Sequence, residues 1–362
     1  MTPDEEAARR AALSDRLRAE KLQALLVTSP VNVRYLTGFT GSNSLLLVTE
    51  SGARLFTDPR YTTQSAEEVS CAISIVKKGP LLNEAIARIK QAKIKRLSFE
   101  KSHILWETYA KLTEELPASV KLRPVEAWVE EARLVKSATE IERIQESVVT
   151  NSLAFDRALR QLRPAKMTES EFAAVLDYQQ RKLGAEGTAF TTIVASGAHS
   201  ALPHAHPRHE TIGLNRLLLV DMGAQQRGYM SDMTRTLVVG KASRRMRQLY
   251  AAVLEAQLAA IDAVKPGALC AEVDRRARIT LKRHGLEKQF IHSTGHGLGL
   301  EIHEPPRLGR TEVRTLAPGM VITIEPGVYL PGEGGIRIED TVLVTETGCD
   351  ILTPTPKDLL VI

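Results

Sequence analysis

The sequence predicts an α+β protein with two domains, an N-terminal α/β domain in residues 1–127 and a larger α+β domain in residues 128–362. Three observations support this prediction. A chain of 362 residues is too long for one ordinary hydrophobic core. Short apolar runs alternate with helical segments in the first part, whereas long helices separate pairs of strands in the second. A strand, a proline and a charged amphipathic helix follow one another near residues 124–130, where we expect the boundary.

The N-terminal domain is expected to open with a helix in residues 1–24. Short apolar runs then indicate strands, and amphipathic segments among them indicate helices. The expected strands are residues 24–29, 44–50, 53–58, 71–78 and 96–102, and the expected helices are residues 81–93 and 106–116.

The C-terminal domain shows helical periodicity in four segments, with strand pairs between them. The expected helices are residues 137–162, 168–184, 242–263 and 271–285. The expected strands lie in residues 191–197, 216–224, 229–239, 321–330 and 335–348. This helix-then-hairpin order occurs twice, which hints at an internal duplication of helices on a curved, mostly antiparallel sheet.

The composition excludes several classes of protein. Hydrophobic residues make up 43% and charged residues 25% of the chain, and the net charge of +5 is spread over short basic runs, so we expect no nucleic-acid partner. The three cysteines lack C-x-x-C spacing, which argues against a disulfide framework and suits a reducing cytoplasm. The sequence has no apolar signal region and no 18-residue apolar run, so we expect a cytoplasmic protein without a membrane span.

Two aspartates interrupt an apolar hairpin in residues 217–239. If the turn is centred on Gln226-Arg227, Asp221 and Asp232 face each other with Cβ atoms about 5 Å apart. A buried ionised carboxylate is costly unless it is solvated, paired or bound to a cation. Taken alone, the pair fits two solvated aspartates at least as well as half of a cation site.

Three histidines fall in residues 290–310, with glycines at alternate positions between them. Glycine lets the backbone approach a neighbour closely. A lone histidine is usually structural, but this clustering favours a functional site: His292, His296 and His303, with Gly295, Gly297 and Gly299. The imidazole of His296 can supply a nitrogen ligand to a metal.

Two glutamates complete the pattern. Glu325 interrupts the apolar run "GMVITIEPGVYL", and Glu339 alternates with Arg337 on one face of "GGIRIEDTVLV". Either glutamate alone fits a surface position on a strand. Together with the aspartates they give four carboxylates and one imidazole, a set that suits two divalent first-row metals whose charge neutralises the carboxylates.

The order Asp, a second Asp eleven residues later, then His, Glu and Glu resembles metallopeptidase family M24. This family has the pita-bread fold and includes methionine aminopeptidases, Xaa-Pro aminopeptidases and Xaa-Pro dipeptidases. The resemblance implies that Asp232 and Glu339 bridge the two metals. It implies the following ligands: Asp221, Asp232, His296, Glu325 and Glu339.

The stretches "TSPVNVRYLTGFTGSNS" and "FTDPRYTTQS" look like the creatinase/prolidase N-terminal domain, which methionine aminopeptidases lack. The stretch "GIRIED" resembles the proline-specific branch of the family. The resemblance therefore implies hydrolysis of the X–Pro peptide bond, with proline-containing di- or short peptides as substrates and a homodimer as the assembly. A full ligand set argues against a creatinase-type C–N hydrolase, which works without metal, and against a non-catalytic binding module.

The resemblance also assigns roles around the metals. It implies that His204 and His303 stabilise the oxyanion, that His292 lies beside the substrate, and that Glu325 carries the proton to the leaving nitrogen. His206, next to His204 in "PHAHP", is read as a neighbour without a catalytic part.

Two arginines are expected to bind substrate. Arg337 belongs to the proline-specific signature, and Arg307 matches an arginine that prolidases use near the proline carboxylate. A surface salt bridge is the alternative for Arg307. We therefore prefer an Xaa-Pro dipeptidase over an Xaa-Pro aminopeptidase. Manganese is the metal we expect first, and the ligand set also permits cobalt, zinc or iron.

Overall fold

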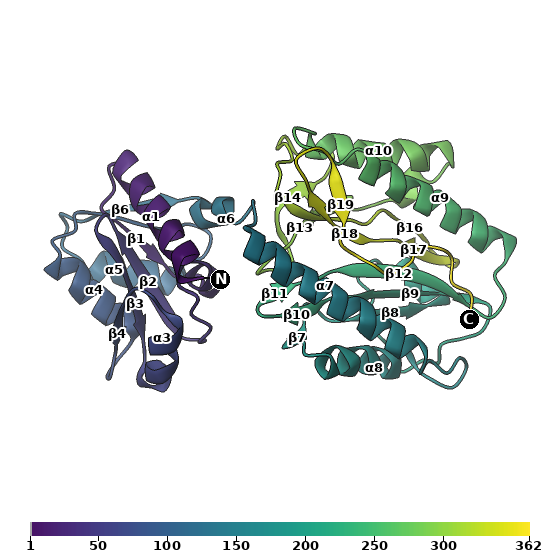
Figure 1. Ribbon diagram of the computed structural model, residues 1–362, viewed down its shortest axis with the longest axis horizontal. Helices are drawn as coiled ribbons and strands as arrows, with labels where there is room; N and C mark the ends of the chain where they lie inside the picture. Colours follow the sequence, from purple (N-terminus) through teal and green to yellow (C-terminus); the bar gives the residue numbers. More distant parts are fainter. Residues whose placement is uncertain (1) are drawn as a thin grey trace. The chain divides into compact units, whose positions relative to one another are not determined.

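A computed structural model describes residues 2–362 of the protein (Figure 1). The chain divides into two compact units, one ending at Arg133 and the other running from Leu134 to Ile362. We describe each unit by itself.

The first unit is a mixed sheet covered by helices on both faces, as the sequence predicts. Its strands, in the spatial order β4-β3-β2-β1-β5-β6, are β1 (Ala24–Val27), β2 (Ser44–Thr49), β3 (Gly52–Thr57), β4 (Ala72–Ile75), β5 (Arg96–Glu100) and β6 (Lys121–Val125). Its longer helices are α1 (Pro3–Ala19), α2 (Pro30–Thr37), α3 (Thr62–Glu68), α4 (Leu81–Gln91) and α5 (Trp106–Glu115). The five strands expected for this unit are confirmed, and β6 is the strand expected before the boundary.

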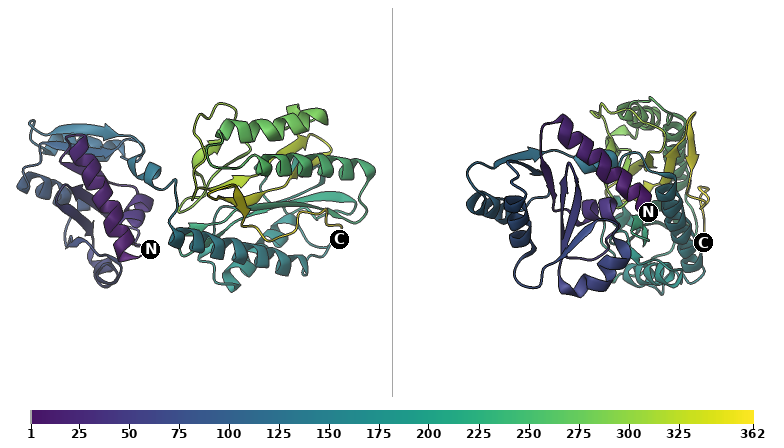
Figure 2. Two further views of the ribbon diagram at one scale, coloured as in Figure 1. Left: turned by 45° about the horizontal axis from the view of Figure 1, so that its top comes forward. Right: turned by 60° about the vertical axis from the view of Figure 1, so that its left-hand side comes forward.

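Alternation along the strands decides which helix covers which face. Leu26 and Leu47 share a core with Ile86 of α4 and Leu112 of α5, and all four side chains are buried. The neighbouring positions Leu25 and Leu46 point to the other face, toward α1 and α2, because successive strand residues alternate. Both faces are therefore apolar, and Figure 2 shows α1 lying across this sheet.

The first unit continues past residue 127, where the sequence analysis placed its end. A short helix, α6 (Trp128–Ala132), belongs to it, because Tyr35 donates a hydrogen bond from its hydroxyl to the carbonyl oxygen of Ala132 at 2.9 Å. Arg133 also donates to the side chain of Asn32 at 2.9 Å. The long helix expected across this region is consequently interrupted before it resumes in the second unit.

The second unit places strands between two pairs of helices. The helices are α7 (Ala138–Leu159), α8 (Glu169–Lys182), α9 (Arg244–Asp262) and α10 (Cys270–Arg283). In Figure 1, α9 and α10 run along one side of the strands and α7 and α8 along the other. One core joins α7 and α8 to β8, β9 and β12, and another joins α9 and α10 to β15, β17 and β18. This is the α+β arrangement that the sequence predicts.

The strands of the second unit form several small sheets. The first half contains β7 (Gly187–Thr188), β8 (Ile193–Ser196), β9 (Arg216–Met222), β10 (Ala224–Gln226), β11 (Tyr229–Met230) and β12 (Met233–Val239). The second half contains β13 (Gly295–Gly297), β14 (Glu304–Leu308), β15 (Val321–Ile324), β16 (Gly327–Leu330), β17 (Gly334–Arg337), β18 (Asp340–Val344) and β19 (Cys349–Ile351). The spatial orders are β11-β10-β7, β12-β9-β8, β14-β13-β15-β18-β19 and β16-β17.

The register of the aspartate hairpin differs from the one we expected. Gln226 pairs with Tyr229, so the two-residue turn is Arg227-Gly228, and both of these residues have positive φ. Such a turn suits the twist of a hairpin, and glycine takes the second position without strain. The reversal is therefore centred one residue later, and Asp221 pairs with Thr234 rather than with Asp232.

The two aspartates still share one face of the ribbon. Continuing the register places Asp232 opposite Gly223, two positions from Asp221, and positions two apart point the same way. Gly223 is required there, because a Cβ atom would lie 2.1 Å from the carbonyl oxygen of Ser231.

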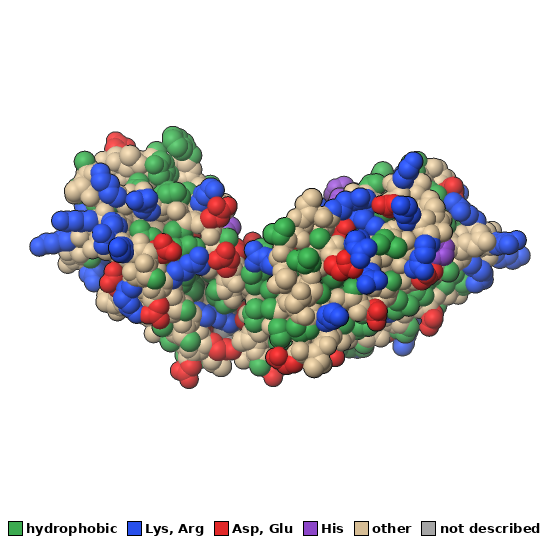
Figure 3. Space-filling model, turned by 90° about the horizontal axis from the view of Figure 1, so that it is seen from above, with side chains coloured by type: hydrophobic (Ala, Val, Ile, Leu, Met, Phe, Trp, Pro, Cys, Tyr) green, Lys and Arg blue, Asp and Glu red, His purple; other side chains and the backbone are tan. Residues whose placement is uncertain are grey.

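Charged side chains are mixed on the surface. Figure 3 shows Lys and Arg interspersed with Asp and Glu over the face that it displays. Among the described residues, no helix combines the length and the apolar character needed to span a bilayer.

A buried ionic network lies directly beside β12. Asp340 is fully buried, accepts hydrogen bonds from Arg235 and Gln257 and forms an ion pair with Lys357, each at 2.8 Å. The remaining N–H groups of Arg235 donate to carbonyl oxygens of the strands and of the C-terminal segment: Thr234, Glu339, Thr355 and Pro356. The network therefore ties three parts of the second unit together.

We expect Asp340→Asn to lower the free energy of unfolding of the second unit by about 3–5 kcal/mol, because it leaves buried cations without their anion. Hydrogen exchange of core peptides from this unit measures the change. Glu333→Ala, which removes an ion pair whose side chains are 55% and 53% exposed, is the control and should change stability by less than about 0.5 kcal/mol. Equal effects of both substitutions would contradict the prediction.

Candidate metal centre

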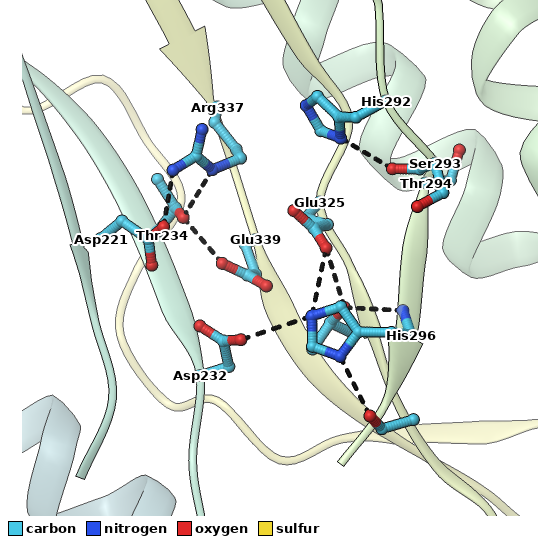
Figure 4. A network of polar contacts seen from close by, with 12 residues as sticks. Asp221, Asp232, Thr234, His292, Ser293, Thr294, His296, Glu325, Arg337 and Glu339 are labelled. Carbon is cyan, nitrogen blue, oxygen red and sulfur yellow. Dashed lines mark hydrogen bonds and ion pairs between the residues drawn. The ribbon is translucent and has the colours of Figure 1, made fainter. Parts of the chain in front are cut away.

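The fold brings the five predicted metal ligands to one place in the second unit (Figure 4). They come from five separate segments: Asp221 from β9, Asp232 from the residue before β12, His296 from β13, Glu325 from the β15–β16 connection, and Glu339 from the β17–β18 connection. Ligand atoms of Asp232, His296 and Glu339 all lie within 4.8 Å of one another. Asp232 and Glu339 are 5% and 2% exposed, so their carboxylates are shielded from water.

The ring of His296 is oriented for ligation. Its Nδ1 lies 3.0 Å from the carbonyl oxygen of Gly297, which makes Nδ1 the protonated nitrogen. Its Nε2 then presents a lone pair 3.6 Å from Asp232 Oδ2 and 3.4 Å from Glu325 Oε1. A histidine that donates from one nitrogen to a backbone carbonyl and offers the other is the usual arrangement of a metal ligand.

The alternating glycines of β13 allow its neighbours to approach. A Cβ atom on Gly295 would lie 1.9 Å from the carbonyl oxygen of Thr323, and one on Gly297 would lie 2.3 Å from that of Pro305. These glycines therefore set the depth at which β13 carries His296 into the site.

The carboxylates repel one another. Burial, and then the neighbouring carboxylates, raise the pKa of Asp232 and of Glu339 well above the usual range. Burial raises the pKa of Glu325 to about 7. In addition, Asp221 Oδ1 is buried without a hydrogen-bond partner among the described residues. A set of acceptor oxygens with one imidazole nitrogen and one unsatisfied buried oxygen fits divalent cations.

Two threonines, which the sequence analysis missed, support the glutamates. Thr234 donates its hydroxyl hydrogen to Glu339 Oε2 at 2.7 Å, and Thr323 donates to Glu325 Oε1 at 3.3 Å. The backbone N–H of His296 donates to the hydroxyl of Thr323 at 3.1 Å, which links two of the ligands.

Arg337 faces protein groups. Its Nη2 donates to Asp221 Oδ2 at 2.6 Å, its Nε to Thr234 at 3.0 Å, and its Nη1 to the Tyr329 hydroxyl at 2.6 Å. A further bond runs to the carbonyl oxygen of Pro203 at 3.3 Å. Arg337 is 3% exposed and is therefore a partner to a predicted ligand, but it also lines the cavity described below, so its contact with substrate stays a prediction.

A directed chain of hydrogen bonds continues from this arginine. The Tyr329 hydroxyl lies 2.9 Å from His292 Nε2, and His292 Nδ1 lies 2.8 Å from the carbonyl oxygen of Ser293. Burial, and then the charge of Arg337, lower the pKa of His292 to about 3, so this ring is neutral and donates from Nδ1. Both of its nitrogens have protein partners. Nothing in the local sequence pattern marks Tyr329, so its role was not predicted.

Together with His292 and Arg337, the remaining predicted residues line a cavity of about 850 Å³ that opens over the carboxylates. The ring of His303 meets that of His296 edge to face, with centroids 4.4 Å apart. Apolar and polar side chains make up the other walls, and among them are Phe190, Ile193, His204, His206, Ile302, Arg307, Glu312 and Arg314. The cavity therefore combines the ligand cluster, exposed imidazoles and a cationic rim, so it can hold a short peptide.

Comparison with known proteins agrees with this geometry. The model of metallopeptidase family M24 matches residues 142–346, and that of the creatinase/prolidase N-terminal domain matches residues 9–135. An Xaa-Pro dipeptidase of Pyrococcus furiosus is 36% identical over 340 residues, which cover 94% of this chain and 95% of the relative.

Two solved structures have the same fold throughout. An Xaa-Pro dipeptidase from Bacillus anthracis is 35% identical with a TM-score of 0.94 and covers 100% of both chains. An X-Pro aminopeptidase from Thermotoga maritima is 35% identical with a TM-score of 0.91, and the match covers 97% of this chain and 100% of the other.

We expect Asp232→Asn to have opposite effects with and without metal. In metal-free protein it removes a repelling charge and should raise the melting temperature. At a metal concentration 100 times Kd, the wild type gains about 2.7 kcal/mol, and the variant should lose most of this gain. Thermal unfolding with Mn²⁺ and after chelation measures both effects.

Asp350→Asn, at an exposed position, is the control and should leave the metal-dependent shift unchanged. A lower melting temperature of the metal-free Asp232→Asn variant would show that repulsion is not the dominant effect at this carboxylate.

Proposed function

The chain belongs to metallopeptidase family M24, and from this premise we propose that it is an exopeptidase that hydrolyses the X–Pro bond, chiefly of Xaa-Pro dipeptides. One observation carries the proposal: the carboxylate cluster, His296 and the histidines His204 and His303 all line the same cavity. The dipeptidase and aminopeptidase relatives support a proline-specific substrate.

The five predicted ligands would hold two divalent metal ions, with manganese as the metal expected first. When bound, such ions lower the pKa of water enough for hydroxide to form near neutral pH and polarise a carbonyl group. Arg337 holds Oδ2 of Asp221, which leaves the unpartnered Oδ1 as the atom available for ligation. The homodimer stays a prediction.

The residues of the chain supply the other catalytic parts. His303 and His204 line the cavity and can donate hydrogen bonds to the oxyanion that forms at the attacked carbonyl. Glu325 can accept the proton of the attacking water and return it to the proline nitrogen. This transfer matters because the nitrogen of an X–Pro bond carries no hydrogen and must be protonated before it leaves.

Arg307 is the group that would select dipeptides. It is exposed on the cavity wall, where its guanidinium can bind the carboxylate of a C-terminal proline through two parallel hydrogen bonds. An Xaa-Pro aminopeptidase is the second candidate. The size of the cavity, whose lining also includes Glu312 and Arg314, and the similar X-Pro aminopeptidase structure both favour it.

We expect the protein to cleave Ala-Pro faster than Ala-Pro-Ala, with activity lost on chelation and restored by Mn²⁺. Arg307→Ala should raise KM for Ala-Pro by roughly 10- to 100-fold, since a charge-assisted pair is lost, and should leave KM for Ala-Pro amide nearly unchanged. Steady-state kinetics with the three substrates measure this.

Arg310→Ala is the matched control, because Arg310 is a nearby arginine whose side chain is 61% exposed and pairs with Glu287. Preferred cleavage of the tripeptide would assign the protein to the aminopeptidases. No cleavage of any X–Pro substrate by protein loaded with metal would overturn the proposed function.

His303→Ala should lower kcat for Ala-Pro by about 10²–10³-fold, as loss of an oxyanion donor does, while metal content stays unchanged. Metal analysis of the purified variant separates this role from ligation. Loss of bound metal in His303→Ala would instead make the ring a support for His296, whose ring it contacts.

A further inference from the structure

His204 lies on a loop that leaves β8 at Ser196 and ends at Arg208, here called the His204 loop (residues 196–208). The C-terminal end of this loop lies beside the first turn of α8. The backbone N–H of Ser170 donates to the carbonyl oxygen of Arg208 at 3.0 Å, and that of Glu169 donates to Glu210 at 3.1 Å. These backbone bonds hold the C-terminal end but do not reach the N-terminal end.

The side chain of Glu169 joins the two ends. One of its carboxylate oxygens accepts from the backbone N–H of Ser196 at 2.8 Å, and the other accepts from that of Arg208 at 3.0 Å. Between these points, Nδ1 of His199 lies 2.9 Å from the same carboxylate. Glu169 is 1% exposed, so water does not compete for these bonds.

The middle of the loop is fixed from the opposite side. Ser200 accepts a hydrogen bond from the backbone N–H of Gly335 at 2.8 Å, and the carbonyl oxygen of Pro203 accepts from Arg337. Ala205 is buried in an apolar cluster. The segment that carries His204 is therefore held in two ways. Gly335 and Arg337 bond to its middle, and Glu169 bonds to its two ends.

We propose that Glu169 is a positioning residue that presents His204 to the cavity by clamping both ends of its loop. The inference rests on the proposed function, in which His204 contacts the substrate. Glu169 touches neither the cavity nor the predicted ligands, so it acts through the loop.

Only a carboxylate satisfies this geometry. Ser196 N–H, Arg208 N–H and His199 Nδ1–H all point at the two oxygens, and a carboxylate only accepts hydrogen bonds. The amide of Glu169→Gln would turn an NH₂ group toward one of these donors. The backbone bonds of α8 remain, so we expect the variant to fold with the loop displaced.

The first test compares Glu169→Gln with Glu171→Gln. Glu171 lies on the same turn of α8, and its side chain bonds to Thr168 instead of to the loop, which makes it the matched control. Glu169→Gln should lower kcat for Ala-Pro by roughly 10- to 100-fold, the order that a misplaced catalytic group costs, at unchanged metal content. The control should keep the wild-type kcat.

A double-mutant cycle with His204→Ala then separates positioning from general stability. If Glu169 acts through His204, adding Glu169→Gln to His204→Ala should lower kcat by less than about twofold, because the shared effect is already lost. Full additivity of the two substitutions would overturn the proposal.

A measurement without activity completes the test. The ring ¹H–¹⁵N signals of His204 in metal-free protein, assigned by their absence in His204→Ala, should shift in Glu169→Gln and stay in place in Glu171→Gln. Unshifted signals in Glu169→Gln would overturn the proposal even if kcat falls. Because this readout needs no substrate, failure of the wild type to cleave X–Pro bonds overturns the proposed function alone.

Discussion

Repulsion among buried carboxylates is the constraint on which the second unit depends. Asp232 and Glu339 are shielded from water and lie close to other acids, so their ionised forms are stable only beside compensating charge. The fold supplies part of this compensation through Arg337, which pairs with Asp221. The rest matches the charge of divalent ions. Because each of the ligands stands on a different segment, the same repulsion opposes close packing of those segments when no cation is present.

The two oxygens of Asp221 have different surroundings, since Arg337 bonds to Oδ2 and Oδ1 has no hydrogen-bond partner among the described residues. Arg337 donates to one oxygen of this aspartate and to the Tyr329 hydroxyl, which lies 2.9 Å from His292, and its charge adds to the effect of burial in keeping His292 neutral. One buried guanidinium thus sets the orientation of a carboxylate and of an imidazole. A lysine could not replace it, since a single ammonium group lacks the planar fork that reaches these partners together.

The sequence predicted the longer helices, the longer strands and the clustering of the five ligands, because these features follow from local periodicity and from a known order of residues. It did not predict the short elements α2, α3, β14 and β19, whose few residues carry little periodicity. It missed the hairpin register, since the centre of the turn depends on which residues adopt positive φ: Arg227 and Gly228 do so here. It also missed Thr234 and Tyr329. Their roles come from contacts with Glu339 and Arg337, which only the folded chain brings near, and neither residue interrupts a local pattern.

The site separates the predicted metal ligands from the histidines that we propose face the substrate. The ligands lie in strands or directly beside them, where backbone ladders fix their positions. His204 and His303 lie on loops, and each loop contacts a buried carboxylate. Glu169 accepts from both ends of the first loop, and Glu304 accepts from the backbone N–H of Glu301 in the second at 3.1 Å. Loops tolerate changes in sequence better than hydrogen-bonded strands do. A fold built this way can keep one metal centre while its substrate walls vary, which accounts for dipeptidase and aminopeptidase structures that resemble this chain equally in sequence.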